Sequence, residues 1–112
     1  MKKIEVIIRP TKLDELKAEL DKLEVRGMTI YEVKGRGLQQ GQTQYVRGQE
    51  AKIDLFPKVK VEVICRDHWL ERIIDVIVNT CQTGKIGDGK IFVYNVEEIV
   101  RIRTGERGDA AL

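Results

Sequence analysis

The sequence predicts an α+β fold in which two β-α-β halves meet at a long loop. Four short segments carry the β-branched or alternating apolar pattern of strands, and two longer segments carry apolar residues at helical spacing. A chain of 112 residues has room for a single domain, 1–112, with one modest core. The order of the segments predicts a ferredoxin-like βαββαβ sandwich with a long loop between strands 2 and 3.

The first half contains a strand, a helix and a second strand. Residues 4–8 are apolar and mostly β-branched, which favours a strand. Thr11 is expected to cap the helix that follows, and the leucines within residues 13–23 fall on one face of it. Gly27 is expected to end this helix, after which residues 28–33 alternate as a second strand.

Residues 34 to about 57 lose all periodicity and form the predicted long loop. Within it, residues 34–48 contain four glycines and four glutamines and present no core face. Loops of this length are uncommon inside a small domain and are generally functional or disordered. A passive linker is not expected in the middle of a domain, so we interpret the loop as functional.

The second half repeats the pattern of the first. Residues 59–65 alternate strictly as a half-exposed strand, Asp67 is expected to cap a helix, and Gly84 is expected to end it. Residues 91–96 form the predicted fourth strand, and the polar tail of residues 104–112 is expected to be loose. Both helices would cover one face of the sheet. The other face suggests oligomerisation through its apolar side chains, namely Phe92, Tyr94 and Val96.

The composition argues against several classes of function. Twenty basic and 18 acidic residues give a net charge of +2, which is too balanced for a duplex-binding surface. Residues 58–64 contain no aromatic residue, which argues against a sheet that stacks single-stranded bases. No apolar run reaches the roughly 18 residues of a membrane span, and residues 1–5 lack a signal-like apolar core. We therefore expect a cytoplasmic location and no direct contact with nucleic acid.

The residues that most often carry catalysis are sparse. His68 is the only histidine, so a histidine-based metal site or catalytic dyad lacks partners. Cys65 and Cys81 lie in apolar patterns and are expected to be reduced core residues. The carboxylates are scattered along solvated faces, so we expect a protein that is not an enzyme, with slow ATP hydrolysis left as a remote alternative.

A glycine-rich segment, residues 83–93 with the sequence TGKIGDGKIFV, has two interpretations. It is either a tight helix-to-strand connection or a turn whose backbone amides cradle an anion. The segment lies after a helix and before a strand, so it is neither a Walker motif nor a Rossmann fingerprint. Phosphate would therefore depend on loop amides together with cations, of which Lys90, Arg101 and Arg103 are nearby in sequence.

The chain resembles the PII signal-transduction proteins of nitrogen metabolism. The match includes the glycine-rich segment 83–93, the ending RIRTGE at residues 101–106, and shorter stretches at residues 1–4, 27–29 and 32–35. It covers essentially the whole chain. The resemblance implies a ferredoxin-like homotrimer with a long flexible loop, the T-loop, at about residues 37–55.

The resemblance also implies ligands. ATP and ADP would compete for clefts between neighbouring subunits, and 2-oxoglutarate would bind beside ATP through Mg²⁺. Gln39 would ligate the metal and contact 2-oxoglutarate, and Lys58 would pair with a carboxylate of the oxo-acid. The residues implied at the nucleotide are Thr29, Gly37, Leu38, Glu62, Ile64, Gly87, Asp88, Gly89, Lys90, Arg101 and Arg103.

The T-loop is where the chain departs from the family. Leu38 stands where the family commonly has a phosphate-binding arginine. Ala51 and Gln49 replace a tyrosine and a serine that some members modify, so no modification is expected at these two positions. The resemblance implies that Arg47 and Gly48 contact a partner, such as an ammonium transporter, the glutamine synthetase system or a transcription regulator. The alternative is a divergent PII-like protein that senses nucleotide only or a different small effector.

Overall fold

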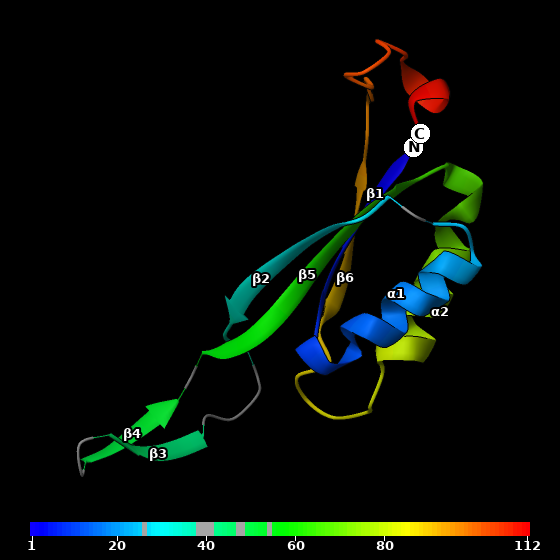
Figure 1. Ribbon diagram of the computed structural model, residues 1–112. Helices are drawn as coiled ribbons and strands as arrows, with labels where there is room; N and C mark the ends of the chain where they lie inside the picture. Colours follow the sequence, from blue (N-terminus) through cyan, green and yellow to red (C-terminus); the bar gives the residue numbers. More distant parts are fainter. Residues whose placement is uncertain (26, 38–41, 47–48, 54) are drawn as a thin grey trace.

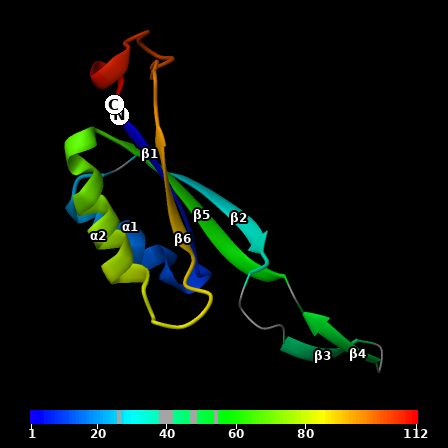
Figure 2. The same ribbon diagram turned by 180° about the vertical axis from the view of Figure 1, so that it is seen from behind.

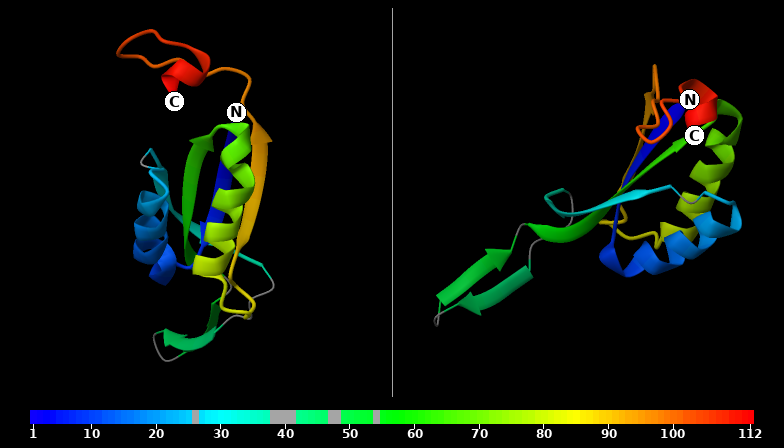
Figure 3. Two further views of the ribbon diagram at one scale, coloured as in Figure 1. Left: turned by 90° about the vertical axis from the view of Figure 1, so that its right-hand side faces the viewer. Right: turned by 45° about the horizontal axis from the view of Figure 1, so that its top comes forward.

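The computed structural model describes residues 1–25, 27–37, 42–46, 49–53 and 55–112 of the chain. The elements of the main body are β1 (Lys2–Ile8), α1 (Leu13–Lys22), β2 (Thr29–Gly35), β5 (Phe56–Cys65), α2 (Leu70–Cys81) and β6 (Lys90–Asn95). The four strands form one antiparallel sheet in the order β2-β5-β1-β6, and both helices lie on one side of it (Figures 1 and 3). This confirms the predicted α+β ferredoxin-like fold.

The core lies between the sheet and the two helices. Alternate residues of the two central strands point into it, and the apolar stripe of each helix closes it from above. Each side chain of this kind stabilises the fold by about 1.5–3 kcal/mol when fully buried. The most deeply buried members are Ile4, Ile8, Val61, Leu16, Leu20, Ile73 and Ile77.

The face of the sheet opposite the helices carries charged and aromatic side chains. In the strand register Glu5 lies opposite both Glu62 and Phe92, so these residues share the face that the helices do not cover. Phe92 is 40% exposed and Tyr94 is 47% exposed. Val96, predicted to extend this row, lies beyond the end of β6 and is half-buried.

Both helices begin differently from the prediction. A 3-10 turn precedes each one, η1 (Pro10–Lys12) before α1 and η2 (Asp67–Trp69) before α2, and none of these elements has a side-chain cap. Thr11 lies inside η1 and therefore does not cap it. The Asp67 carboxylate instead pairs with the amino group of Met1 at 2.8 Å.

The two predicted helix ends are also wrong. The helix α1 ends at Lys22 rather than at Gly27, because Glu24 takes a left-handed φ of 62° and the Val25 amide turns back to the Leu20 carbonyl. Similarly, α2 ends at Cys81, and the next residue is already extended. A non-glycine residue can occupy the left-handed region at a helix end, as Glu24 does, and an extended residue such as Gln82 ends a helix without any glycine. A search for glycine therefore places both ends too late.

The long loop contains regular structure that the sequence did not predict. The pairing of β2 with β5 continues from Thr29 opposite Glu62 to Gly35 opposite Phe56. Beyond this stem, β3 (Gln42–Val46) and β4 (Gln49–Ile53) pair as a separate hairpin that extends away from the main sheet (Figures 1 and 2). A lone two-stranded hairpin has no packed core, so it needs no apolar alternation.

The tail is held by local contacts rather than loose. Val100 bridges Arg107, the Arg101 amide donates to the Glu106 carbonyl at 2.9 Å, and a short 3-10 helix η3 (Gly108–Ala111) follows. The tail ends at the same end of the sheet as the N-terminus (Figure 1). Among the described residues, no helix is both long enough and apolar enough to cross a membrane.

Candidate functional site

The glycine-rich segment folds around the carboxylate of Asp88. The amides of Thr83 and Gly84 donate to Oδ2 at 2.7 and 2.9 Å, and the Thr83 hydroxyl donates to Oδ1 at 2.5 Å. Arg9, at the end of β1, donates from Nε to the same Oδ1 at 3.1 Å. These donors, beginning with Thr83, hold the pKa of Asp88 far below its usual range, so the group is ionised.

The segment is also fixed against strand β1. Gly89 has a φ of 102° and passes so close to β1 that a Cβ added to it would lie 1.6 Å from the Ile7 carbonyl oxygen. Arg9 makes a second contact, from Nη2 to the Ile86 carbonyl at 2.9 Å. Figures 1 and 2 show this yellow loop beside the blue end of β1. Contacts with β1 and Arg9 therefore hold the loop in a fixed position beside the sheet.

Cations gather at this loop. Lys58 of β5 donates from Nζ to the Gly87 carbonyl at 2.7 Å, and Lys90 opens β6 directly after the loop. Burial and the nearby Arg9 lower the pKa of Lys58 from its ordinary value. Basic side chains beside exposed loop amides attract phosphate or carboxylate groups.

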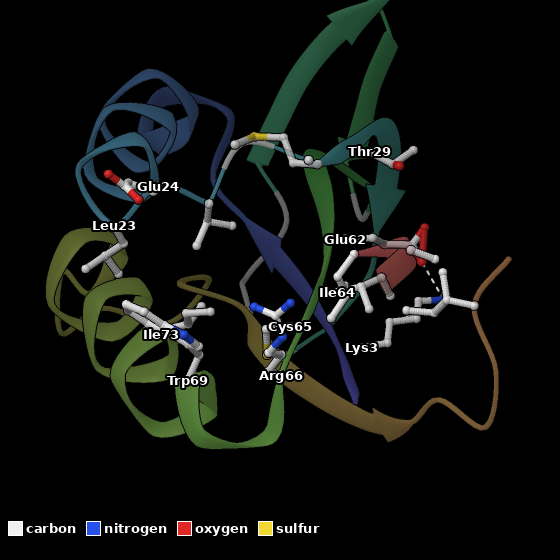
Figure 4. Close-up of a pocket in the computed structure, with 16 residues that line it drawn as sticks. Lys3, Leu23, Glu24, Thr29, Glu62, Ile64, Cys65, Arg66, Trp69 and Ile73 are labelled. Carbon is white, nitrogen blue, oxygen red and sulfur yellow. Dashed lines mark ion pairs between the residues drawn. The ribbon is translucent and has the colours of Figure 1, made fainter. Parts of the chain in front are cut away.

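A second set of predicted residues lines a hollow of about 840 Å³ at the other end of the sheet. Figure 4 shows Thr29, Glu62 and Ile64 on its sheet side, with Trp69 and other apolar side chains on its helix side. Glu62 is paired with Lys3 at 2.5 Å, and this hydrogen bond, followed by one from Tyr31, lowers the pKa of the Glu62 carboxyl. The hollow is thus lined mainly by apolar side chains, with the charged side chains of Lys3, Glu24, Glu62 and Arg66 also in its lining.

The two predicted arginines lie on the tail, whose last residues, Ala111 and Leu112, line this hollow. Arg101 pairs with Glu106 at 2.9 Å and donates to the Leu112 carbonyl at 3.2 Å. Leu112 itself lines the hollow. Between the two arginines, Ile102 is 99% exposed, and Arg103 is exposed as well.

Comparison with known proteins identifies the family. The family model described as nitrogen regulatory protein P-II matches residues 1–106. The chain is 54% identical to a nitrogen regulatory protein P-II of Rhodospirillum rubrum and 51% identical to one of Klebsiella oxytoca. It is also 51% identical to nitrogen regulatory protein P-II 1 of Escherichia coli K12, and each match covers both chains completely. The chain belongs to the P-II family. The resemblance found in the sequence is confirmed, and these relatives are named as regulatory proteins rather than as enzymes.

In this P-II family member, one copy does not bring the predicted nucleotide residues together. Lys58 and Glu62 lie on the same face of β5 but four residues apart, which is about 13 Å of extended strand. The glycine loop lies at the Lys58 end, where Lys58 donates to the Gly87 carbonyl. The hollow lies at the Glu62 end, and Figure 1 shows the tail, which carries Arg101 and Arg103, at the opposite end of the sheet from the glycine loop. We call the glycine loop together with Lys58 and Lys90 the loop half-site. We call the hollow with Thr29, Glu62 and Ile64, together with Arg101 and Arg103 of the tail, the hollow half-site.

The remaining predicted residues belong to the T-loop. Gly37 is described and exposed, with open space where a side chain would be. Ala51 and Gln49 lie in β4, opposite Gln44 and Val46 of β3. Four residues fall outside the described part of the chain, namely Leu38, Gln39, Arg47 and Gly48.

Sequence reasoning missed the part that Arg9 plays in the loop half-site. Arg9 follows a strand and precedes Pro10, a position that suggests only a solvated strand end. The signal that reveals it is the strand register, in which Ile7 of β1 lies opposite Lys90 of β6. This pairing places the residues after β1 beside those before β6.

Proposed function

We propose that this P-II family member is a homotrimeric sensor that binds ATP or ADP between neighbouring copies and regulates a nitrogen-metabolism target through its T-loop. The observation that carries the proposal is the separation of the loop half-site from the hollow half-site. When different surfaces of two copies meet head to tail, the contact repeats from copy to copy, and it closes into a ring where the rotation between copies allows it. Such a ring places the loop half-site of one copy against the hollow half-site of the next.

The chemistry of the two half-sites suits a nucleotide. The apolar hollow with Thr29, Glu62 and Ile64 accommodates a base. Glycine-loop amides with Lys90 then face the phosphates, and Arg101 and Arg103 come from the adjacent copy. A planar guanidinium group forms two parallel hydrogen bonds to phosphate oxygens, so arginine is well suited to contact the phosphates. Arg101 must then exchange its Glu106 partner for phosphate.

2-Oxoglutarate is the second proposed effector. Lys58 would pair with one of its carboxylates, and Gln39 would ligate a Mg²⁺ ion shared with ATP. Mg²⁺ needs only one or two protein ligands when triphosphate and carboxylate oxygens supply the others. A loop that each ligand holds in a different conformation acts as a population switch, provided that each ligand prefers one state.

The T-loop would carry this state to a partner. Arg47 and Gly48 would contact an ammonium transporter, the glutamine synthetase system or a transcription regulator, without uridylylation at Ala51 or phosphorylation at Gln49. The protein would act in the cytoplasm and reach a membrane only through a transporter partner. It would not bind nucleic acid directly, and any ATP hydrolysis would be incidental.

Calorimetry with ATP tests the site. We expect Lys90→Ala to weaken ATP binding, whereas Lys85→Ala, which removes an exposed lysine from the same loop, leaves it unchanged. Unchanged ATP affinity in Lys90→Ala would overturn the site. Sedimentation at several protein concentrations tests the ring, and a stable monomer that binds ATP normally would contradict it.

Leu38 favours one alternative, a sensor of nucleotide alone or of another small effector. Titration of 2-oxoglutarate decides between the two. The first proposal expects binding only with ATP and Mg²⁺ present. Binding that needs neither ATP nor Mg²⁺ contradicts the bridged geometry. No binding at saturating ATP and Mg²⁺ favours the alternative.

A further inference from the structure

We propose that Arg9 and Asp88 form a clamp that holds the glycine loop in its binding shape before any ligand arrives, so that Asp88 acts on nucleotide affinity through the loop and not by touching the nucleotide. The inference rests on the proposed function, because it concerns the same nucleotide site. It assigns positioning roles to Arg9, which lies outside the predicted site, and to Asp88, which the resemblance places at the phosphates.

The first step is the number of donors on one carboxylate. Oδ1 of Asp88 accepts from the Thr83 hydroxyl and from Arg9 Nε, and Oδ2 accepts from the amides of Thr83 and Gly84. Each oxygen therefore has two donors already. The contacts join the start of the loop, its far side and the end of β1, which are three separate parts of the chain.

The second step concerns charge. An ionised carboxylate repels phosphate, so a free Asp88 beside a triphosphate would weaken binding. The guanidinium of Arg9 neutralises it locally at 3.1 Å, and Nη2 of the same group donates to the Ile86 carbonyl. Both oxygens of Asp88, together with Nε and Nη2 of Arg9, are thus used in contacts within the loop.

The third step is what the clamp fixes. Gly84, Gly87 and Gly89 all take positive φ values, and glycine has the largest conformational freedom of any residue. Ordering such a segment only when the ligand binds would reduce affinity, whereas ordering it beforehand preserves affinity. The clamp sets the position of Gly87, whose carbonyl accepts from Lys58 at 2.7 Å.

Asp88→Asn is a sharp test, because it keeps the shape of the side chain. The asparagine NH₂ would replace one carboxylate oxygen, and it would then face two donors instead of accepting from them. We expect Asp88→Asn and Arg9→Gln each to weaken ATP binding by about tenfold, since charge-assisted hydrogen bonds are lost. The double variant should be no weaker than either single variant, because the two residues act as one unit.

Three further measurements separate positioning from direct contact. The losses should be the same with and without Mg²⁺, and adenosine, which carries no phosphate, should bind all variants alike. In the ligand-free protein, hydrogen exchange at the amides of Thr83 and Gly84 should accelerate in Asp88→Asn. The control variant is Asp14→Ala, which removes an exposed aspartate from α1 and should change none of these quantities.

Additive losses in the double variant would overturn the clamp. A loss that appears only with Mg²⁺ would show that Asp88 contacts the metal, and weaker ATP binding with unchanged amide exchange would show that it contacts the ligand. If the wild type binds no ATP, the proposed function fails, and the exchange measurement still decides whether the clamp orders the loop. If Asp88→Asn does not fold, Thr83→Val, which removes one donor to Oδ1, provides the same comparison.

Discussion

Gly89 is the position at which the structure makes its most quantitative prediction. The residue lies directly before β6, crosses the backbone of β1 and has a φ of 102°. A Cβ on Gly89 would lie 1.6 Å from the Ile7 carbonyl oxygen and 2.8 Å from the Ile7 carbonyl carbon. No side-chain rotation relieves this overlap, because both contacted atoms belong to the backbone of a central strand.

The expected cost of Gly89→Ala has two parts. The left-handed φ costs an alanine about 1–2 kcal/mol, and forcing packed backbone apart adds about 1–3 kcal/mol. Gly84 and Gly27 are natural controls, because a Cβ at either position meets nothing within 4 Å. Gly84 has a φ of 85°, so Gly84→Ala should cost only about 1–2 kcal/mol. Gly27→Ala should be neutral or stabilise by up to about 1 kcal/mol.

Urea unfolding followed by circular dichroism measures these differences. All variants must be compared at one protein concentration, because the stability of an oligomer depends on concentration. We expect Gly89→Ala to be less stable than Gly84→Ala by at least about 1 kcal/mol, the lower bound for overpacking. Equal stabilities for these two variants would refute the argument that backbone contact with Ile7 fixes this glycine.

Three further predictions concern pH, core packing and thiol reactivity. The pKa of Asp88 is lower in the folded state, so its stabilisation is present above about pH 4 and is lost as the pH falls. Unfolding curves of the wild type and Asp88→Asn should therefore converge in acid, and a constant difference would contradict this. Leu20→Ala should lower the free energy of unfolding by urea by about 2–5 kcal/mol. Ile102→Ala, at a fully exposed position, should lower it by less than about 0.5 kcal/mol. Equal losses would contradict the burial of Leu20 in the core. Burial raises the thiol pKa of Cys65 and Cys81, so a thiol reagent should label both quickly only after unfolding, and fast labelling of the native protein would contradict their burial.

The main sheet was predictable because one of its faces is buried. Burial imposes the alternation that identified the strands around Ile4 and Val61, and it imposes the helical stripe that includes Ile73. The hairpin of β3 and β4 carries no such imprint, since its pairing depends on backbone hydrogen bonds. The helix starts were misplaced for a related reason, because a 3-10 turn such as η1 satisfies amides without the side-chain cap expected of Thr11.

The site was less predictable than the fold. The motif around Gly87 was visible in the sequence, but its partner Arg9 is 79 residues from Asp88 and only the register of β1 with β6 joins them. Likewise, Thr29 and Glu62 come together because they are paired residues of β2 and β5. Side chains that meet through strand pairing are far apart in the sequence, so no local motif reveals them.

The stem that closes the T-loop bears on how such a protein diversifies. The last pair of the main sheet is Gly35 opposite Phe56, and Phe56 is buried, whereas β3 and β4 form a sheet of their own. Substitutions beyond this pair leave the register of the domain intact. The outer loop can therefore change in sequence without a change in the core, in the glycine loop or in the hollow. If the T-loop binds the partner as proposed, a chimaera that exchanges residues 38–54 between two relatives should keep the body of one protein and acquire the binding partner of the other.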